Sequence, residues 1–268
     1  MEFAAFGGQG GRVEISGNYF TLESAGDVKK NELKPHLKQT WCIGKLTAEF
    51  LARMERILWL YRLPYNPLRP VLCYDERPCF LIGDVVKGIP MSEGGIAKEH
   101  YSYEKLGSCC LLATIEPLTG KRIADVYDQR RKIEFALHFQ KIAERYPAAE
   151  KIIVMLDNLN THNASSFYEV FEAAEAFRLS QRCEFIHTPK SASWLNMIEI
   201  EFSAISRLCL NRRIPTKEQL AKEVLAIIKE RSAKEIKINW QFSIETAREK
   251  LNRHYQKVNP ENHKYQKT

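Results

Sequence analysis

The sequence predicts an α/β fold in which helices cover both faces of a mixed β-sheet. Three strand-like runs come first, over residues 70–76, 79–86 and 108–117. Helical and strand-like segments then alternate as far as residue 210. This order is typical of a mixed sheet, because each parallel crossover places a helix against a sheet face.

The strand runs are embedded between segments of helical periodicity. Apolar residues recur at helical spacing over 47–61, with Thr47 as the expected N-cap. Arg77 and Pro78 separate the first two strand runs, which predicts a tight hairpin there. The later elements are expected as a helix over 133–146, a strand over 151–157, a helix over 166–179 that opens with a Ser166/Glu169 capping box, a strand over 183–188, a helix over 194–210 and two basic helices after residue 216.

Composition narrows the classes of protein to consider. The chain has 268 residues, of which 44% are hydrophobic and 27% charged, values typical of globular domains. Its apolar runs are far shorter than the roughly 20 residues that span a bilayer, and residues 1–11 lack the pattern of a signal peptide. We therefore expect no membrane segment. The formal net charge of +7 favours a polyanionic partner such as nucleic acid.

The seven cysteines contain no Cys-x-x-Cys pair. Cys109 and Cys110 are adjacent and would point to opposite faces of a strand. We therefore expect free thiols in a reducing cytosol, and neither a disulfide framework nor a zinc site.

Two aspartates stand where strands end. Asp75 lies in or at the end of the first strand, and Asp157 follows the buried run 152–156 directly. An aspartate in such a place is often a turn residue. A carboxylate at the edge of a core is costly, however, unless it is paired or binds a metal. The strand and helix order matches the ribonuclease-H-like architecture, in which the first strand lies beside the fourth, so the two aspartates would meet at one sheet edge.

A third acid is expected from the helix over 194–210. Glu199 and Glu201 are two positions apart and point roughly 200° apart around a helix, so only one can join the site. Both flank the apolar stripe, and periodicity does not choose between them. A polar row formed by Asn196, Ser203 and Ser206 favours Glu199, and Glu201 is interpreted as a surface or ion-pairing residue.

Other polar residues near these positions have simpler interpretations. Glu76 and Asp84 are expected to be solvated charges at strand ends. His162 could contact a substrate phosphate, although capping of the next helix is the favoured interpretation, and His187 is expected to be structural.

Three converging carboxylates suit Mg²⁺, which prefers oxygen ligands. Two such ions about 3.5–4 Å apart can activate the attacking oxygen and stabilise the leaving oxygen in phosphoryl transfer. The basic balance of the chain fits a phosphodiester backbone as the substrate.

Three ordered segments resemble one known family. They are "KPHLKQTWCIGKLTAEFLARMERILWLYRLPYNPLRPVLCYDERP", "IIVMLDNLNTH" and "HTPKSASWLNMIEIEFSAISRLCLNRRIP", and the likeness runs from about Leu33 to about Tyr255. The family is the insertion-sequence-six-thirty group of bacterial transposases, cousins of the mariner transposases with an Asp-Asp-Glu catalytic domain.

The resemblance implies a ribonuclease-H-like fold that cuts and joins double-stranded DNA at element ends and target, with Mg²⁺ or Mn²⁺ as cofactor and two ions in the site. Its catalytic and metal-binding acids fall on Asp75, on Asp157 and, because "LNMIE" occupies the place of the family motif, on Glu199. Glu199 follows Asp157 by 42 residues, somewhat more than in the mariner cousins. The implied location is the bacterial cytoplasm, in association with the nucleoid.

The resemblance also divides the chain into an irregular lead-in (1–28), a helical segment (29–66), a ribonuclease-H-like catalytic domain (67–215) and a basic helical tail (216–268). Residues 1–28 do not resemble the helix-turn-helix region with which family members begin. We therefore expect the catalytic half alone, with a homodimer on DNA or a separate helix-turn-helix polypeptide as partners. The alternatives are a ribonuclease-H-like nuclease without strand transfer and an inactive DNA-binding remnant.

Overall fold

The computed structural model describes residues 13–15, 18–20 and 46–265. The chain forms two compact units, Met1–Cys42 and Ile43–Thr268. In the first unit, β1 (Val13–Ile15) and β2 (Asn18–Phe20) pair in antiparallel fashion. The rest of the expected lead-in over 1–28 and the beginning of the helical segment over 29–66 lie outside the described residues. Within the described ranges, none of the helices has the length and apolar character needed to cross a bilayer.

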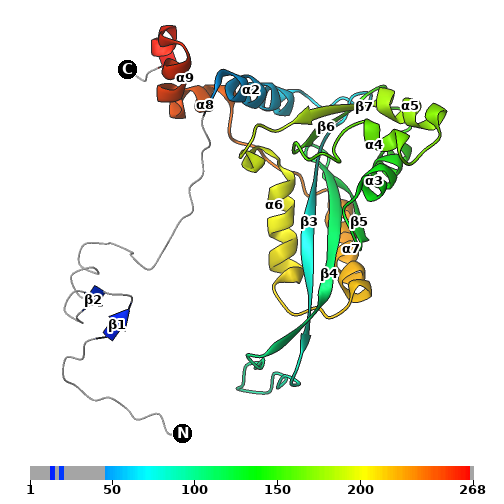
Figure 1. Ribbon diagram of the computed structural model, residues 1–268, viewed down its shortest axis with the longest axis vertical. Coiled ribbons are helices and arrows are strands. Elements are labelled where there is room, and N and C mark those ends of the chain that lie inside the picture. The colour runs from blue at the N-terminus through cyan, green and yellow to red at the C-terminus, as the bar shows by residue number, and fades with distance from the viewer. Residues whose placement is uncertain (1–12, 16–17, 21–45, 266–268) are drawn as a thin grey trace. The chain divides into compact units, whose positions relative to one another are not determined.

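A five-stranded mixed sheet organises the second unit (Figure 1). Its strand order is β5-β4-β3-β6-β7. The strands are β3 (Val71–Asp84), β4 (Tyr103–Glu116), β5 (Lys121–Tyr127), β6 (Ile152–Leu156) and β7 (Cys183–His187). The first three pair antiparallel, whereas β3–β6 and β6–β7 are parallel. The expected mixed sheet, with its first long strand beside the strand that precedes Asp157, is confirmed.

The expected hairpin at Arg77 and Pro78 is wrong, because both residues lie inside the continuous strand β3. β3 pairs with β4 along its length, but it pairs with β6 only over Val71–Cys73. Beyond Cys73 the second edge of β3 has no strand partner among the described residues, so a proline without an N–H is tolerated there. The turn lies instead between β3 and β4, whose hairpin extends beyond the rest of the sheet (Figure 1).

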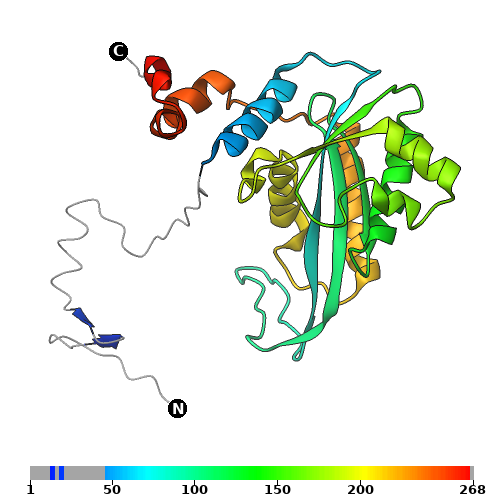
Figure 2. The ribbon, with the colours of Figure 1, turned by 45° about the horizontal axis from the view of Figure 1, so that its top comes forward.

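Helices cover the two faces of the sheet (Figures 1 and 2). On one face, α3 (Lys132–Arg145), α4 (Ser165–Tyr168) and α5 (Ala173–Arg182) share an apolar cluster with the strands. On the other, the cluster is shared by α2 (Ala48–Arg62), α6 (Ile198–Ile205), α7 (Lys217–Ala233) and α8 (Ile244–Lys250). α9 (Asn252–Val258) and a short helix η3 (Pro260–Tyr265) follow.

Local sequence signals explain several helix ends, and tertiary packing overrides others. Thr47 caps α2 as expected, since its hydroxyl accepts a hydrogen bond from the Phe50 N–H at 3.2 Å. The expected helix over 166–179 is divided into α4 and α5. Its capping box does not form, because the buried Ser166 hydroxyl donates to the Thr161 carbonyl.

The expected helix over 194–210 is also interrupted. A 3-10 turn η1 (Ser193–Leu195) comes first, α6 begins at Ile198, and a π-helical segment η2 (Ser206–Leu210) ends it. The start of α6 is fixed from two sides. The Asn196 side-chain amide donates to the Tyr74 carbonyl at 2.8 Å, and the Tyr61 hydroxyl donates to the Leu195 carbonyl at 2.8 Å.

Glu201 ties α6 to α7 and β5. Its side chain is 1% exposed and lies between two arginines. Arg231 donates from Nε and Nη2 at 2.7 and 3.0 Å, and Arg122 donates from Nη2 at 2.9 Å. Of the two expectations for this residue, ion pairing is confirmed and surface exposure is wrong. Its partners come from distant parts of the chain, so helix periodicity alone could not reveal this burial.

We expect Glu201→Ala to lower the free energy of unfolding by about 3–5 kcal/mol, because it leaves two arginines without their carboxylate. Urea denaturation of the purified chain measures this. The control is Glu144→Ala on the exposed face of α3, for which we expect a change within about 0.5 kcal/mol. Equal midpoints for the two variants would contradict the structural role of Glu201.

The loss of unfolding free energy caused by Glu201→Ala should depend on pH. Burial alone would raise the pKa of Glu201, but hydrogen bonds from Arg231 and Arg122 outweigh burial and lower this pKa below its ordinary value of 4.5. The ionised carboxylate therefore stabilises the fold fully above pH 4.5, and this contribution is lost as the pH falls through the lowered pKa. The difference in unfolding free energy between wild type and variant should be constant near neutrality and shrink in acid. A difference that is the same at every pH would count against this assignment.

Candidate active site

The register of two parallel strands places Asp75 and Asp157 at the same level of the sheet. Cys73 in β3 is the partner of Met155 in β6. Asp75 and Asp157 each follow two residues later, so both lie just beyond the paired region. Asp157 follows the end of β6, whereas Asp75 lies within β3 where the pairing with β6 has stopped. The structure thus brings together two acids that are 82 residues apart in the sequence.

The alternation of side chains along β3 separates Asp75 from its neighbour Glu76. Asp75 has the same parity as Cys73, which belongs to the apolar cluster shared with α6. Glu76 has the parity of Leu72 and Tyr74, which belong to the cluster shared with α3. Successive side chains of a strand point to opposite faces, so only Asp75 is directed toward the helix that carries Glu199.

Glu199 lies in the first turn of α6 and is exposed. The hydrogen bond from Asn196 to the Tyr74 carbonyl holds this turn beside β3, one residue before Asp75. The polar row expected beside Glu199 does not form an open surface for a ligand. Asn196 is buried, and the Ser206 hydroxyl donates to the Phe202 carbonyl.

The pKa of Asp75 reflects its burial and the two neighbouring acids. Burial raises the pKa of Asp75 to about 7, and the negative charges of Asp157 and Glu199 act in the same direction. A hydrogen bond from the Glu76 N–H to Oδ1, at 2.7 Å, opposes this shift and does not cancel it. The charges of Asp157 and Glu199 thus act on Asp75, and the positive charge of His162 only partly offsets their repulsion.

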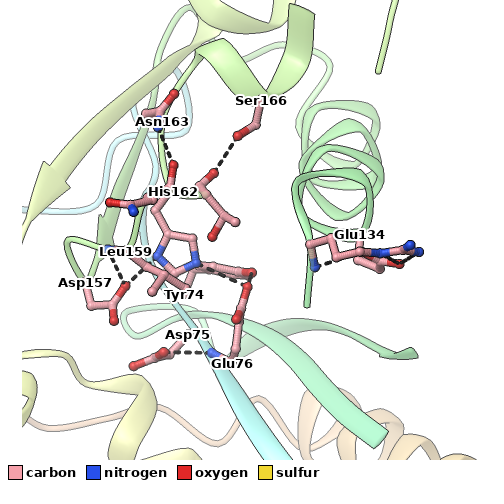
Figure 3. A network of polar contacts seen from close by, with 12 residues as sticks. Tyr74, Asp75, Glu76, Glu134, Asp157, Leu159, His162, Asn163 and Ser166 are labelled. Atoms are coloured by element: carbon pink, nitrogen blue, oxygen red, sulfur yellow. Dashed lines mark hydrogen bonds and ion pairs between the residues drawn. The ribbon is translucent and has the colours of Figure 1, made fainter. Parts of the chain in front are cut away.

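A buried histidine orients Asp157 (Figure 3). His162 is 1% exposed, with Nδ1 2.5 Å from Asp157 Oδ1 and Nε2 3.2 Å from Glu76 Oε1. Burial alone would lower the pKa of His162, but its contacts with Asp157 and Glu76 raise it to about 9. The same contact with His162 lowers the pKa of Asp157.

This network corrects two expectations. His162 neither caps the next helix nor reaches a substrate phosphate, because its ring is enclosed and stacks on Phe135 at a centroid distance of 5.1 Å. Glu76 is not solvated: it is buried and accepts a hydrogen bond from the Tyr74 hydroxyl at 3.0 Å. The shared parity of Tyr74 and Glu76 was the available signal for this burial, but the histidine that pairs with Glu76 comes from a loop 86 residues away.

His187 and Asp84, for which the sequence also gave expectations, lie outside the group of acids. His187 ends β7, and its Nδ1 lies 3.2 Å from the Asp157 carbonyl oxygen, which agrees with a structural role. Asp84 ends β3 as expected and forms an ion pair with Arg213 at 2.6 Å.

The donor set fits a hard divalent cation in charge and chemistry. Asp75, Asp157 and Glu199 supply carboxylate oxygens, and a cation would neutralise the repulsion that raises the pKa of Asp75. Within the described part of the chain, no three His, Cys, Asp or Glu side chains stand close enough together to form a finished metal-binding group. The described cysteines are all free and buried, as expected, and take no part in the site.

Comparison with known proteins shows the family and the fold. Residues 70–221, more than half of the chain, match the family model described as DDE superfamily endonuclease. A search of the curated proteins found no match. Among solved structures, the fold is similar to the Mos1 transposase paired-end complex with the left transposon end, with a TM-score of 0.53 and 11% identity over 90% of this chain and 70% of that chain.

The Mos1 strand transfer complex is similar as well, with a TM-score of 0.51 and 12% identity over 90% of this chain and 70% of that chain. At these identities the likeness is one of fold. It places the five-stranded sheet and its flanking helices in the ribonuclease-H-like architecture. The family match covers both sheet-edge aspartates and the first turn of α6. The chain therefore belongs to the DDE superfamily endonucleases.

Proposed function

We propose that this chain is the catalytic domain of a DNA transposase that cuts a phosphodiester bond at the ends of an insertion sequence and joins the freed 3′ end to target DNA. The observation that carries the proposal is the placement of Asp75 level with Asp157 and beside the helix that carries Glu199, where burial and the charges of the other two acids raise the pKa of Asp75. Mos1, whose fold is similar, is a transposase.

In this proposal Asp75, Asp157 and Glu199 hold one or two divalent cations, Mg²⁺ or Mn²⁺. When bound, these ions supply charge stabilisation for the attacking and leaving oxygens of an in-line displacement. The reaction exchanges phosphodiester oxygens. Water attacks phosphorus and displaces the 3′ oxygen, which leaves as a 3′ hydroxyl beside a 5′ phosphate. This hydroxyl then attacks a phosphorus of the target strand and displaces the 3′ oxygen of that strand, so one P–O bond breaks for each one formed. No redox step is involved.

The surrounding residues position the acids. His162 holds Oδ1 of Asp157 from the side of the core, at 2.5 Å. This leaves the second oxygen of a 44% exposed carboxylate free for substrate or cation. Asn196 fixes the first turn of α6 against β3, so Glu199 is carried on a rigid element. Positioning by rigid elements is what in-line displacement needs, since small misplacements are costly in rate.

Partners and context complete the proposal. The substrate is double-stranded DNA, both at element ends and at the target. A homodimer on DNA and a separate helix-turn-helix polypeptide are proposed to assemble with this chain, in the bacterial cytoplasm.

Asp75→Ala, Asp157→Ala and Glu199→Ala should each abolish cleavage and leave the fold intact, because each removes a proposed cation ligand without opening the core. A supercoiled plasmid that carries the DNA bordering the coding sequence is the substrate, and circular dichroism checks the fold. The control is Asp128→Asn, an acid that is 74% exposed and pairs with Lys217. Cleavage without any joined product would favour a nuclease over a transposase. Wild-type activity in the three alanine variants would overturn the site assignment.

Mn²⁺ binding should depend on Asp157. Calorimetric titration of the wild type should give a binding heat that Asp157→Asn loses, since the amide keeps the shape of the side chain and removes its charge. Asp128→Asn should titrate like the wild type. Equal heats in wild type and Asp157→Asn would place the cation elsewhere in the chain.

A further inference from the structure

A hollow of about 740 Å³ opens beside Asp157. Asp157 is the one proposed catalytic acid among its described lining residues, so the proposed reaction leaves most of the hollow without a role. Its walls are the first turns of α2, the loop after β6 and the loop after β7. The lining residues that matter here are Arg53, Asp157, Asn158, Lys190, Ser191 and Ser193. A second hollow of about 340 Å³ shares Arg53 and continues between α2 and the edge strand β7, where Arg56 and His187 line it.

Lys190 stands at the lip of the larger hollow on a loop that is held in place. The Thr188 N–H donates to the Leu156 carbonyl at 2.9 Å, and the Ala192 N–H donates to the Pro189 carbonyl at 3.1 Å. Ser191 adopts a φ of 59°, a left-handed conformation that is uncommon for residues other than glycine and clusters at functional sites. Lys190 itself is exposed and, among the described residues, forms neither an ion pair nor a hydrogen bond.

Arg53 faces the same hollow from α2. It pairs with Glu49 at 2.6 Å, but both side chains are largely exposed, at 42% and 71%. An exposed pair of this kind contributes little to stability, so a phosphate can replace the glutamate as the partner of Arg53 at little cost. Two cationic side chains, Arg53 and Lys190, thus border a hollow that the acids Asp157 and Glu49 also line.

We propose that this groove binds an unpaired DNA strand next to the bond that is cut, with Lys190 and Arg53 contacting its phosphates. The inference rests on the proposed function, since it is the acids that make DNA the substrate. The volume lies within the range of about 300–1,000 Å³ that holds small ligands, so the hollow has room for a few nucleotides of a single strand. Asn158, Ser191 and Ser193 add polar groups for sugars and base edges.

Binding measured without divalent ions tests this separately from catalysis. Fluorescence anisotropy compares a labelled duplex with the same duplex bearing a short unpaired end, across a range of salt concentrations. Lys190→Ala should lower the slope of log K against log salt by about 0.7 on the unpaired end, the value expected for one lost phosphate contact on a single strand. It should also reduce the preference for the unpaired end, and Lys190→Arg should restore both.

The matched control is Lys229→Ala, which removes an exposed lysine from α7, the helix that packs on β5 at the opposite edge of the sheet. It should leave the preference for the unpaired end unchanged. If Lys190→Ala and Lys229→Ala show the same slope and the same preference, the groove assignment is overturned, whatever the cleavage assays show. Loss of cleavage in the acid variants with equal slopes would keep the proposed function and reject only this groove.

Discussion

The two-sided pairing of β3 is the constraint on which the rest of the structure depends. Pairing with β6 over Val71–Cys73 fixes the parallel register that sets Asp75 level with Asp157. Because this pairing then stops while β4 continues on the other side, the second edge of β3 is left for α6. The site exists because one strand is central at its beginning and open on one side further along.

Much of this arrangement was predictable from local sequence. Buried strands give continuous apolar runs, so the strand before Asp157 and the alternation of helices and strands after the first sheet strands were readable, and the ribonuclease-H-like fold class followed from them. The sequence also predicted three acids for the site, and the structure places Asp75 level with Asp157 and on the side of β3 that faces α6. Periodicity alone left Glu199 and Glu201 equivalent, since both flank one apolar stripe. The family resemblance favoured Glu199, and the structure gives a physical reason: Glu201 is buried against two arginines.

What escaped prediction depends on partners distant in the chain. Pro78 reads as a turn signal, but it is harmless in a strand whose second edge is unpaired. β5 carries charges that look unsuitable for a strand until Arg122 meets Glu201 and Asp125 meets His138. Glu76 looks like a solvated charge because the histidine that buries it lies far along the sequence. In each case a local rule gave way to a contact that only the folded chain supplies.

The order of the acids along the chain has a consequence for folding. The β3–β4 hairpin can form early from nearby segments, whereas Asp75 and Asp157 meet only after a closure across 82 residues, and Glu199 arrives after 42 more. Contacts between residues this far apart in the sequence form late, because the chain must lose the entropy of closing a long loop before the contact can stabilise it. The repulsion among the three carboxylates is therefore imposed on the final steps of assembly. Any cation that binds them would act as a folding ligand, by favouring the completed chain over its partly folded forms.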